Sequence, residues 1–202
     1  MQNWYAPSLT NPAEAGLQDW PLADIVALFQ TGRSGTAMVS GPMAEVVQHS
    51  TQRWAPDDLR AMALYLKQLA RTPGAGSEVP LAPGAAGAVS GARLYEKHCA
   101  ECHGDRGQGK TGSDGNIAYP RLDGNRAVTL VSPVNAVQTV LNGGFAPATA
   151  GHPRPFGMPP FVLELNDSQI AAILTYVRSQ WGNRAPAVSE LDVLRVRRAG
   201  LP

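Results

Sequence analysis

The chain of 202 residues is short of net charge, of long apolar runs and of cysteine. A formal net charge of +1 gives no reason to expect a nucleic-acid partner. No apolar run is long enough to cross a bilayer, which takes about 20 residues. The first residues, Met1 to Pro7, lack the charged and apolar regions of a secretory signal. The abundant glycine and proline instead predict long loops in one or two small globular domains.

The two cysteines both lie in the segment Cys99-Ala100-Glu101-Cys102-His103. This C-x-x-C-H pattern is typical of c-type haem attachment. The thiols can add to the two vinyl groups of haem as thioethers, and the imidazole of His103 can then bind the iron. The sequence therefore predicts one covalent haem c, with His103 as the proximal ligand.

Two other kinds of site use the same residues. A C-x-x-C pair can be a thiol–disulfide redox motif, but no βαβ pattern surrounds this one and the following histidine is then unexplained. Zinc could take Cys99, Cys102, His103 and His98. A structural zinc site needs four ligands, often in two separated pairs, and the chain has no third cysteine. Haem c is the preferred interpretation.

The second axial ligand is predicted to be Met158, which lies in Phe156-Gly157-Met158-Pro159-Pro160. Histidine and methionine together are a cytochrome c ligand pair, and they leave no open position for oxygen or peroxide. A methionine can equally be a core residue. His152, in the same loop, is a rival ligand. His98 and His49 are interpreted as ordinary helix or surface histidines.

The pattern of apolar residues and helix caps predicts an all-α fold. Residues 73–89, rich in proline, glycine and alanine, are interpreted as a linker. Residues 90–202 are interpreted as a complete mono-haem domain with a C-terminal extension, in which residues 104–115 are too glycine-rich for regular structure. The arginines at 195, 197 and 198 are expected on a solvated face. The expected helices of this domain cover residues 90–98, 133–141 and 166–181.

Residues 1–72 repeat the order of parts of the second half of that domain. Helices expected over 21–30 and 56–69 flank Ser40-Gly41-Pro42-Met43, which parallels the segment around Met158. We interpret residues 1–72 as a truncated cytochrome c-like domain without its haem-attachment motif. The chain is then either cut from a longer multihaem protein or carries a haem-less relic, and the mid-domain start favours the first. No metal is assigned to Met43.

Several segments make the chain resemble the c-type cytochrome subunits of bacterial periplasmic dehydrogenases, such as those for alcohol, gluconate and sorbitol. Related subunits serve some molybdenum hydroxylases. The resemblance rests on NWYAPSLT, GPMAEVVQHST, GARLYEKHCAECHGDRGQG, MPPF and SQWGNRAP. It implies subunits with three cytochrome c domains, of which this chain holds the end of the second and the third.

The resemblance also implies roles for residues outside the haem motif. The Pro120 carbonyl is expected to accept the imidazole N–H of His103. Tyr119 and Arg121 are expected either near a haem propionate or simply at the surface. Gly91, Tyr95 and Tyr176 are expected where the first and last helices of the domain cross.

The predicted function is electron transfer from the catalytic subunit of a periplasmic dehydrogenase toward quinone or a terminal oxidase. The chain itself is not expected to be an enzyme. A peroxidase-like haem enzyme and a docking module are the alternatives. Haem c is attached outside the bacterial cytoplasm, so the absence of a signal suggests a mature, truncated or partial chain. Membrane association is expected only through partners or missing segments.

Overall fold

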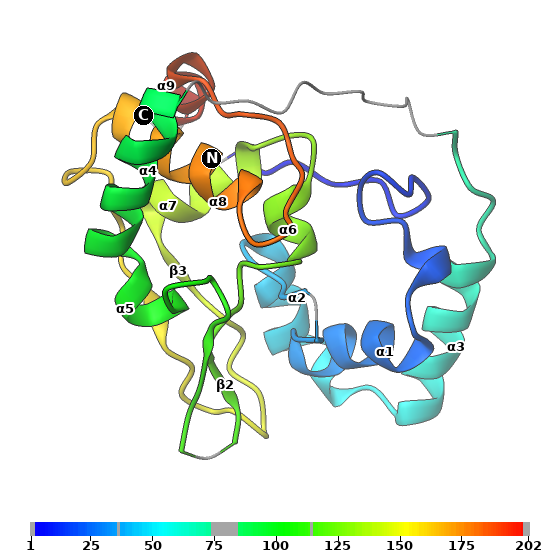
Figure 1. Ribbon diagram of the computed structural model, residues 1–202. Coiled ribbons are helices and arrows are strands. Elements are labelled where there is room, and N and C mark those ends of the chain that lie inside the picture. The colour runs from blue at the N-terminus through cyan, green and yellow to red at the C-terminus, as the bar shows by residue number, and fades with distance from the viewer. Residues whose placement is uncertain (1–2, 36, 74–84, 114, 200–202) are drawn as a thin grey trace. The chain divides into compact units, whose positions relative to one another are not determined.

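The computed structural model of the protein describes residues 3–35, 37–73, 85–113 and 115–199, with side chains from residue 89 onward in the third range. This described part is mainly helical, as the sequence predicts, with two small two-stranded sheets (Figure 1). It forms two compact units. The attachment unit takes the described residues of 1–5, 78–144 and 158–202, and the N-terminal unit takes those of 6–77 and 145–157.

The elements of each unit follow one another along the chain. The attachment unit contains α4 (Ala85–His98), α5 (Ala100–His103), β1 (Lys110–Thr111), β2 (Ile117–Tyr119), α6 (Arg126–Thr129), α7 (Val134–Asn142), α8 (Asp167–Ser179) and α9 (Glu190–Ala199). The N-terminal unit contains η1 (Leu17–Asp19), α1 (Leu22–Thr31), α2 (Pro42–His49), η2 (Thr51–Arg53) and α3 (Pro56–Gln68). The unit boundary falls within β3 (Gly144–Phe145) and β4 (Gly157–Met158). Within the described ranges, no helix combines the length and apolarity needed to span a bilayer.

The attachment unit is organised by the crossing of α4 and α8. Gly91 lets the two helices touch, because a Cβ atom on it would lie 2.4 Å from the carbonyl oxygen of Ala172. One turn later the rings of Tyr95 and Tyr176 pack with their centroids 5.7 Å apart. The expected place of Gly91, Tyr95 and Tyr176 at this crossing is confirmed.

Helix α8 begins with a complete capping box. The Asn166 side chain accepts the backbone N–H of Gln169, and the Gln169 side chain accepts that of Asn166, both at 2.9 Å. After this cap, the apolar residues predicted along one face of α8 are all buried in the core of the attachment unit. The core of the unit includes Tyr95, Val137, Leu141, Phe161, Leu165, Ile170, Ile173, Leu174, Val177 and Val193.

Two arginines fasten the outer parts of the attachment unit. Arg178 of α8 is fully buried, and its guanidinium donates to the carbonyls of Val128, Leu130 and Pro186 at 2.6, 2.8 and 3.0 Å. Arg197 of α9 donates to the Asp167 carboxylate at 2.6 Å. The expectation of a solvated arginine face is therefore wrong for Arg197. Its guanidinium also donates to the carbonyls of Val162 and Leu165 at 2.6 and 2.9 Å.

The N-terminal unit has a smaller core. Leu17, Trp20, Ile25 and Ala63 are buried together between η1, α1 and α3. Lys67 closes one end of this core, because its ammonium donates to the carbonyls of Gln18 and Trp20. The helices predicted over 21–30 and 56–69 correspond to α1 and α3 to within one residue at each end.

The segment 145–157 belongs to the N-terminal unit rather than to the continuous domain predicted over residues 90–202. Two glutamines one turn apart explain this grouping. The Gln48 side chain accepts the backbone N–H of Ala148 at 3.2 Å, and the Gln52 side chain donates to the Ala148 carbonyl at 3.1 Å. Gly32 contacts the same segment, since a Cβ atom on it would lie 2.4 Å from the Pro147 ring.

Two other predicted boundaries need correction. Of the linker predicted over 73–89, residues 74–84 lie outside the described part, and α4 already begins at Ala85 instead of Ser90. The run from Ala85 to Val89 is rich in alanine, the best helix former, and can extend the helix toward its N-terminus. The glycine-rich stretch 104–115 contains a strand, β1, which pairs antiparallel with β2.

Candidate functional site

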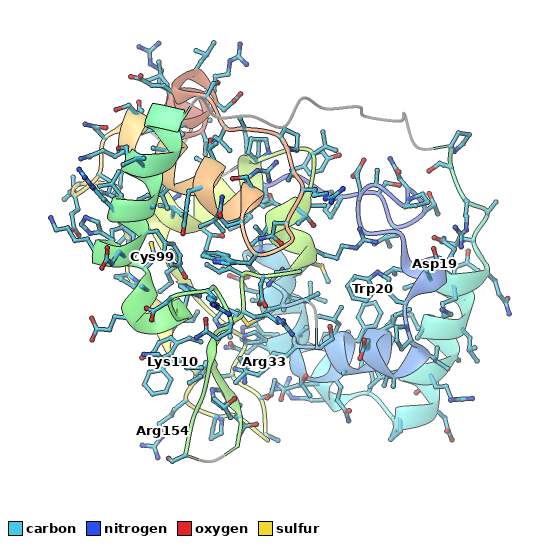
Figure 2. All side chains as sticks on the ribbon, in the orientation of Figure 1. Asp19, Trp20, Arg33, Cys99, Lys110 and Arg154 are labelled. Carbon is cyan, nitrogen blue, oxygen red and sulfur yellow. The ribbon has the colours of Figure 1, made fainter. Side chains whose placement is uncertain are left out.

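Helix α4 leads directly into α5, and Cys99 lies at this junction (Figure 2). Cys99 is the residue between the helices, and its backbone N–H donates to the Tyr95 carbonyl at 2.8 Å. Cys102 follows one turn later within α5. The two cysteines are three residues apart, which is the spacing of the haem-attachment motif. The two thiols are free and partly exposed, as addition to a flat porphyrin requires.

The environment of Cys99 argues against a thiol–disulfide centre. Burial, helped by the neighbouring Cys102 thiol, raises the pKa of Cys99 to about 12. Redox-active cysteines instead have lowered pKa values, because the thiolate is the attacking species. A zinc site is equally unsupported, since no three His, Cys, Asp or Glu residues of the described part are grouped to hold a metal.

His103 ends α5 with its imidazole buried. Its Nδ1 lies 2.8 Å from the Pro120 carbonyl oxygen, the contact that the resemblance implied. Burial lowers the pKa of His103, although the Pro120 hydrogen bond partly opposes this. A neutral imidazole that donates from Nδ1 keeps its lone pair on Nε2. That nitrogen can bind a metal, and the carbonyl fixes the orientation of the ring.

Gly109 explains how Pro120 reaches this position. Its backbone N–H donates to the His103 carbonyl at 2.8 Å. It has φ +73°, and a Cβ atom on it would lie 2.6 Å from the Tyr119 carbonyl oxygen and 2.7 Å from the Arg121 nitrogen. Only glycine combines that backbone conformation with such an approach. The chain around Pro120 can therefore lie directly against the end of the haem motif.

The neighbours of Pro120 are already engaged within the chain. Tyr119 is the last residue of β2 and pairs with Lys110 of β1. The Arg121 guanidinium is half exposed and holds the Asp123 carboxylate with two hydrogen bonds, at 2.8 and 2.7 Å. This fork matches the surface alternative for Arg121. A contact of Tyr119 or Arg121 with a propionate remains a prediction.

Met158 ends β4 and is anchored through the end of α7. Gly143 has φ +65°, and a Cβ atom on it would lie 2.3 Å from the Met158 carbonyl oxygen. The backbone N–H groups of Phe161 and Val162 then donate to the carbonyls of Val140 and Leu141, at 3.0 and 3.1 Å. The half-buried Met158 side chain packs against the core of the attachment unit, as does Cys99.

The other histidines and Met43 have different surroundings from His103 and Met158. The Nδ1 atom of His98 lies 3.1 Å from a carboxylate oxygen of Glu164, and the His98 ring packs edge-on against Phe161. His152 is buried and belongs to the N-terminal unit, whereas His103 and Met158 share the attachment unit. His49 and Met43 are residues of α2 in the N-terminal unit.

The donors of the attachment unit fit haem c. They comprise two free thiols and one buried imidazole whose Nδ1 donates to the Pro120 carbonyl. A thioether packs against the same core as the first thiol. Nitrogen and sulfur donors of this kind suit iron in a porphyrin. Sequence reasoning gave no role to Gly107 or to the segment around Trp181 and Asn183, where the only signal was the motif SQWGNRAP.

Comparison with known families defines the class of protein. Residues 88–181 match the sequence profile of the cytochrome c family, described as Cytochrome c. The match includes the whole haem-attachment motif, Pro120 and Met158. Residues 88–181 therefore form a cytochrome c domain, and a covalent haem c is the cofactor that such a domain implies.

The relatives show which kind of c-type cytochrome the chain resembles, namely the cytochrome subunits of dehydrogenases. The chain is 36% identical to the cytochrome c subunit of the quinone alcohol dehydrogenase of Gluconobacter oxydans (strain 621H), over all of this chain and 43% of that protein. It is 33% identical to the fructose dehydrogenase cytochrome subunit of Gluconobacter japonicus, over 98% of this chain and 44% of that protein. It is 30% identical to the gluconate 2-dehydrogenase cytochrome c subunit of Pantoea cypripedii, over 98% of this chain and 46% of that protein.

The chain thus spans less than half the length of these relatives. Their names confirm the resemblance to dehydrogenase cytochrome subunits. They also agree with the expectation of an electron-transfer component rather than a catalytic subunit.

Proposed function

We propose that this chain carries single electrons through one haem c whose iron is bound by His103 and Met158. The observation that carries the proposal is the buried His103 imidazole, held at Nδ1 by the Pro120 carbonyl at 2.8 Å and following two free thiols. Bound haem c supplies an iron centre that cycles between ferric and ferrous states. The chain's own part is to hold, orient and enclose that group.

Each site residue has a separate task in this proposal. Cys99 and Cys102 hold the porphyrin through thioether bonds. The Pro120 carbonyl keeps the His103 ring oriented and raises its basicity as a ligand. Met158 supplies a neutral sulfur ligand, which raises the reduction potential. With two ligands from the chain, the iron has no open position, and this favours electron transfer over peroxide chemistry.

We propose that residues 1–72 are the second half of a further cytochrome c-like domain. In both modules a helix ends at a glycine with positive φ, Gly32 after α1 and Gly143 after α7. A Gly-Met or Gly-Pro-Met segment and then a longer helix follow in each case. Similarity to the relatives extends over the whole chain and not only over residues 88–181. Because this module has no C-x-x-C-H motif, one haem is proposed for this chain.

The proposed donor is the catalytic subunit of a periplasmic dehydrogenase, since the relatives are named as cytochrome subunits of alcohol, fructose and gluconate dehydrogenases. The proposed acceptor is quinone or a terminal oxidase. A periplasmic location is proposed because haem c is attached outside the bacterial cytoplasm. Association with the inner membrane is proposed to be peripheral, through partners.

The test is to export the chain with a signal sequence in a bacterium that attaches haem c. The purified protein is expected to carry one haem through denaturation, and its reduced form to show the narrow α band of a c-type cytochrome. The variant Cys99→Ala with Cys102→Ala is expected to lose all covalent haem. Retention of haem by this variant on a denaturing gel would reject the attachment site.

The two alternatives give different outcomes with the same material. Rapid reaction of the isolated protein with peroxide or cyanide would favour a haem enzyme with an open axial position. Capture of a dehydrogenase by the haem-free double variant would favour a docking module. An inert, reversibly reducible protein supports electron transfer.

A further inference from the structure

The turn that follows α8 has an unusual backbone. Trp181 has φ +55° and is, within the described ranges, the one residue other than glycine with positive φ. A bulky residue in this region is an outlier that the surrounding structure must maintain. The turn is closed by a hydrogen bond from the Asn183 N–H to the Gln180 carbonyl at 2.9 Å, and Gly182, with φ +85°, completes it.

This conformation places the Trp181 ring against Gly107, in the loop that follows the haem motif. A Cβ atom on Gly107 would lie 2.6 Å from Cζ3 of the indole, so any larger residue would displace the ring. The indole also packs on Tyr95 and Tyr176, with ring centroids 5.1 and 5.6 Å away. The aromatic cluster at the helix crossing thus extends to cover Gly107.

Gly107 in turn holds the chain just after Pro120. Its carbonyl accepts the backbone N–H of Leu122 at 2.6 Å and that of Asp123 at 3.1 Å. Displacement of Gly107 would therefore move Leu122, which is two residues from the carbonyl that binds His103.

Asn183 holds the same stretch from the other end of the turn. Its buried side chain accepts the N–H of Gly124 at 2.8 Å and donates to the Leu122 carbonyl at 3.0 Å. It also donates to the Val177 carbonyl at 2.8 Å, which ties this stretch to α8. Residues 122–124 are thus fixed by both Trp181, through Gly107, and Asn183.

We propose that the turn 180–183 is a brace that positions the Pro120 carbonyl against Nδ1 of His103. Trp181 and Asn183 are positioning residues: they act on the proximal ligand through Gly107 and Leu122 and touch neither the iron nor the porphyrin in this proposal. A well-aligned Nδ1–H···O bond makes the imidazole a more basic ligand, and this favours the ferric state. Loosening the brace should weaken that bond and raise the reduction potential. The inference rests on the proposed function, because it assigns a role toward the His103 ligand.

The test uses the full chain, exported and loaded with haem. Trp181→Ala and Asn183→Ala are expected to raise the reduction potential and to speed exchange of the His103 Nδ1 proton by about tenfold, as judged by nuclear magnetic resonance of the ferrous protein. Trp181→Phe keeps an aromatic ring and should retain most of the wild-type values. If Trp181→Ala does not fold, Asn183→Ala decides the matter, because it removes the hydrogen bonds to Gly124 and Leu122 and leaves the indole in place.

Two glycines provide a matched control. Gly107→Ala should reproduce the shift, because its methyl group meets the indole. Gly115→Ala should not, since Gly115 has a similar φ of +79° and, apart from its chain neighbours, no atom of the described residues lies within 4 Å of an added Cβ. In a Trp181→Ala background, Gly107→Ala should have a smaller effect than in the wild type. Equal effects in both backgrounds would contradict the contact.

Unchanged potentials and unchanged proton exchange in the haem-loaded variants would overturn the brace, even if the variants were less stable. Failure of the wild-type chain to take up covalent haem would be a different result, since it would overturn the proposed function as well. The two failures are distinguished by the intact mass of the wild-type protein.

Discussion

A single imidazole connects the sequence motif to the chemistry proposed for it. His103 is buried, and its Nδ1 is already occupied by the Pro120 carbonyl at 2.8 Å. Because burial lowers the pKa of His103, the ring stays neutral near pH 7 and keeps Nε2 as its ligand atom. A solvated histidine after a C-x-x-C pair would have neither a fixed ring nor a fixed tautomer.

Met158 is best tested by removing its sulfur. In the haem-loaded protein, Met158→Ala is expected to lower the reduction potential by roughly 0.1 V, within the range of about 0.8 V that axial ligands span. It should also allow carbon monoxide to bind the ferrous protein. Redox titration and the carbon monoxide difference spectrum provide the measurements.

Met43→Ala is the matched control for that experiment. Met43 follows a Gly-Pro pair in the N-terminal unit and is 43% exposed. Its removal should leave the potential unchanged. An unaltered potential in Met158→Ala would reject Met158 as ligand and direct attention to His152.

Tyr95 predicts a pH dependence of stability. Its buried hydroxyl donates to the Gly104 carbonyl at 2.6 Å, and burial is the main cause that raises the pKa of Tyr95 well above its ordinary value. In the unfolded chain the phenol loses its proton above pH about 10, whereas the folded protein retains it. The folded state then binds more protons, so its stability should fall as pH rises above about 10.

Urea unfolding at pH about 8 and about 11 tests this prediction. Tyr95→Phe should cost about 1 kcal/mol at the lower pH, because one hydrogen bond is lost, and should lose less stability than the wild type between the two pH values. Tyr65→Phe, at an exposed ring of α3, should follow the wild type. Parallel behaviour of all three proteins would contradict a buried neutral phenol.

At the scale of the elements, the attachment unit is organised by one close crossing, between α4 and α8. Gly91→Ala places a methyl group 2.4 Å from the Ala172 carbonyl oxygen, so α4 and α8 must separate. The free energy of unfolding is expected to fall by about 1–3 kcal/mol, measured by urea unfolding of the haem-loaded protein. Gly35→Ala should change it by less than about 0.5 kcal/mol, because the added Cβ meets no atom of the described residues within 4 Å apart from its chain neighbours. Equal effects of the two substitutions would place the crossing elsewhere.

Arg178 provides a second test of how the elements are joined. Its buried guanidinium serves carbonyls from two separate segments, around residues 128–131 and at Pro186. Lysine lacks the planar fork, so Arg178→Lys should leave buried carbonyls without donors and cost about 2–4 kcal/mol in urea unfolding. Arg195→Lys is the control, because Arg195 is exposed on α9 and should change stability little. A loss as small as that of the control would show that these carbonyls find other donors.

The elements show which features the sequence could predict. Caps and apolar periodicity are local, and they placed α1, α3, α7 and α8 within two residues at each end. The start of α4 was missed because an alanine-rich run between prolines and glycines gives no cap signal. The pairing of β1 with β2 was missed because strands of two and three residues have no measurable period.

The residues of the candidate site also fall into those that the sequence could predict and those that it could not. The haem motif is contiguous, so its residues could be identified directly. The Asp123 partner of Arg121 and the partly buried Asp167 partner of Arg197 depend on where side chains meet after folding. Trp181 and Asn183 entered the sequence analysis only as part of SQWGNRAP, a motif of the family resemblance. No pattern in the sequence predicts a tryptophan with positive φ.

At the scale of the whole molecule, neither compact unit is one continuous segment of the chain. The cytochrome c match ends at residue 181, whereas the attachment unit continues through α9. The loop between β3 and β4 groups with the N-terminal unit through Gln48 and Gln52. Sequence patterns are read in order, but such grouping depends on contacts between residues about 100 positions apart. The contiguous domain predicted over residues 90–202 therefore differs from the grouping of contacts in the structure, and it stays a prediction.

The most direct test is the intact mass, under denaturing conditions, of the exported chain after haem attachment. We expect the mass of the polypeptide plus one haem, with the increment absent from the Cys99→Ala, Cys102→Ala double variant. A polypeptide of unmodified mass, from cells that attach haem to a control cytochrome, would contradict the account.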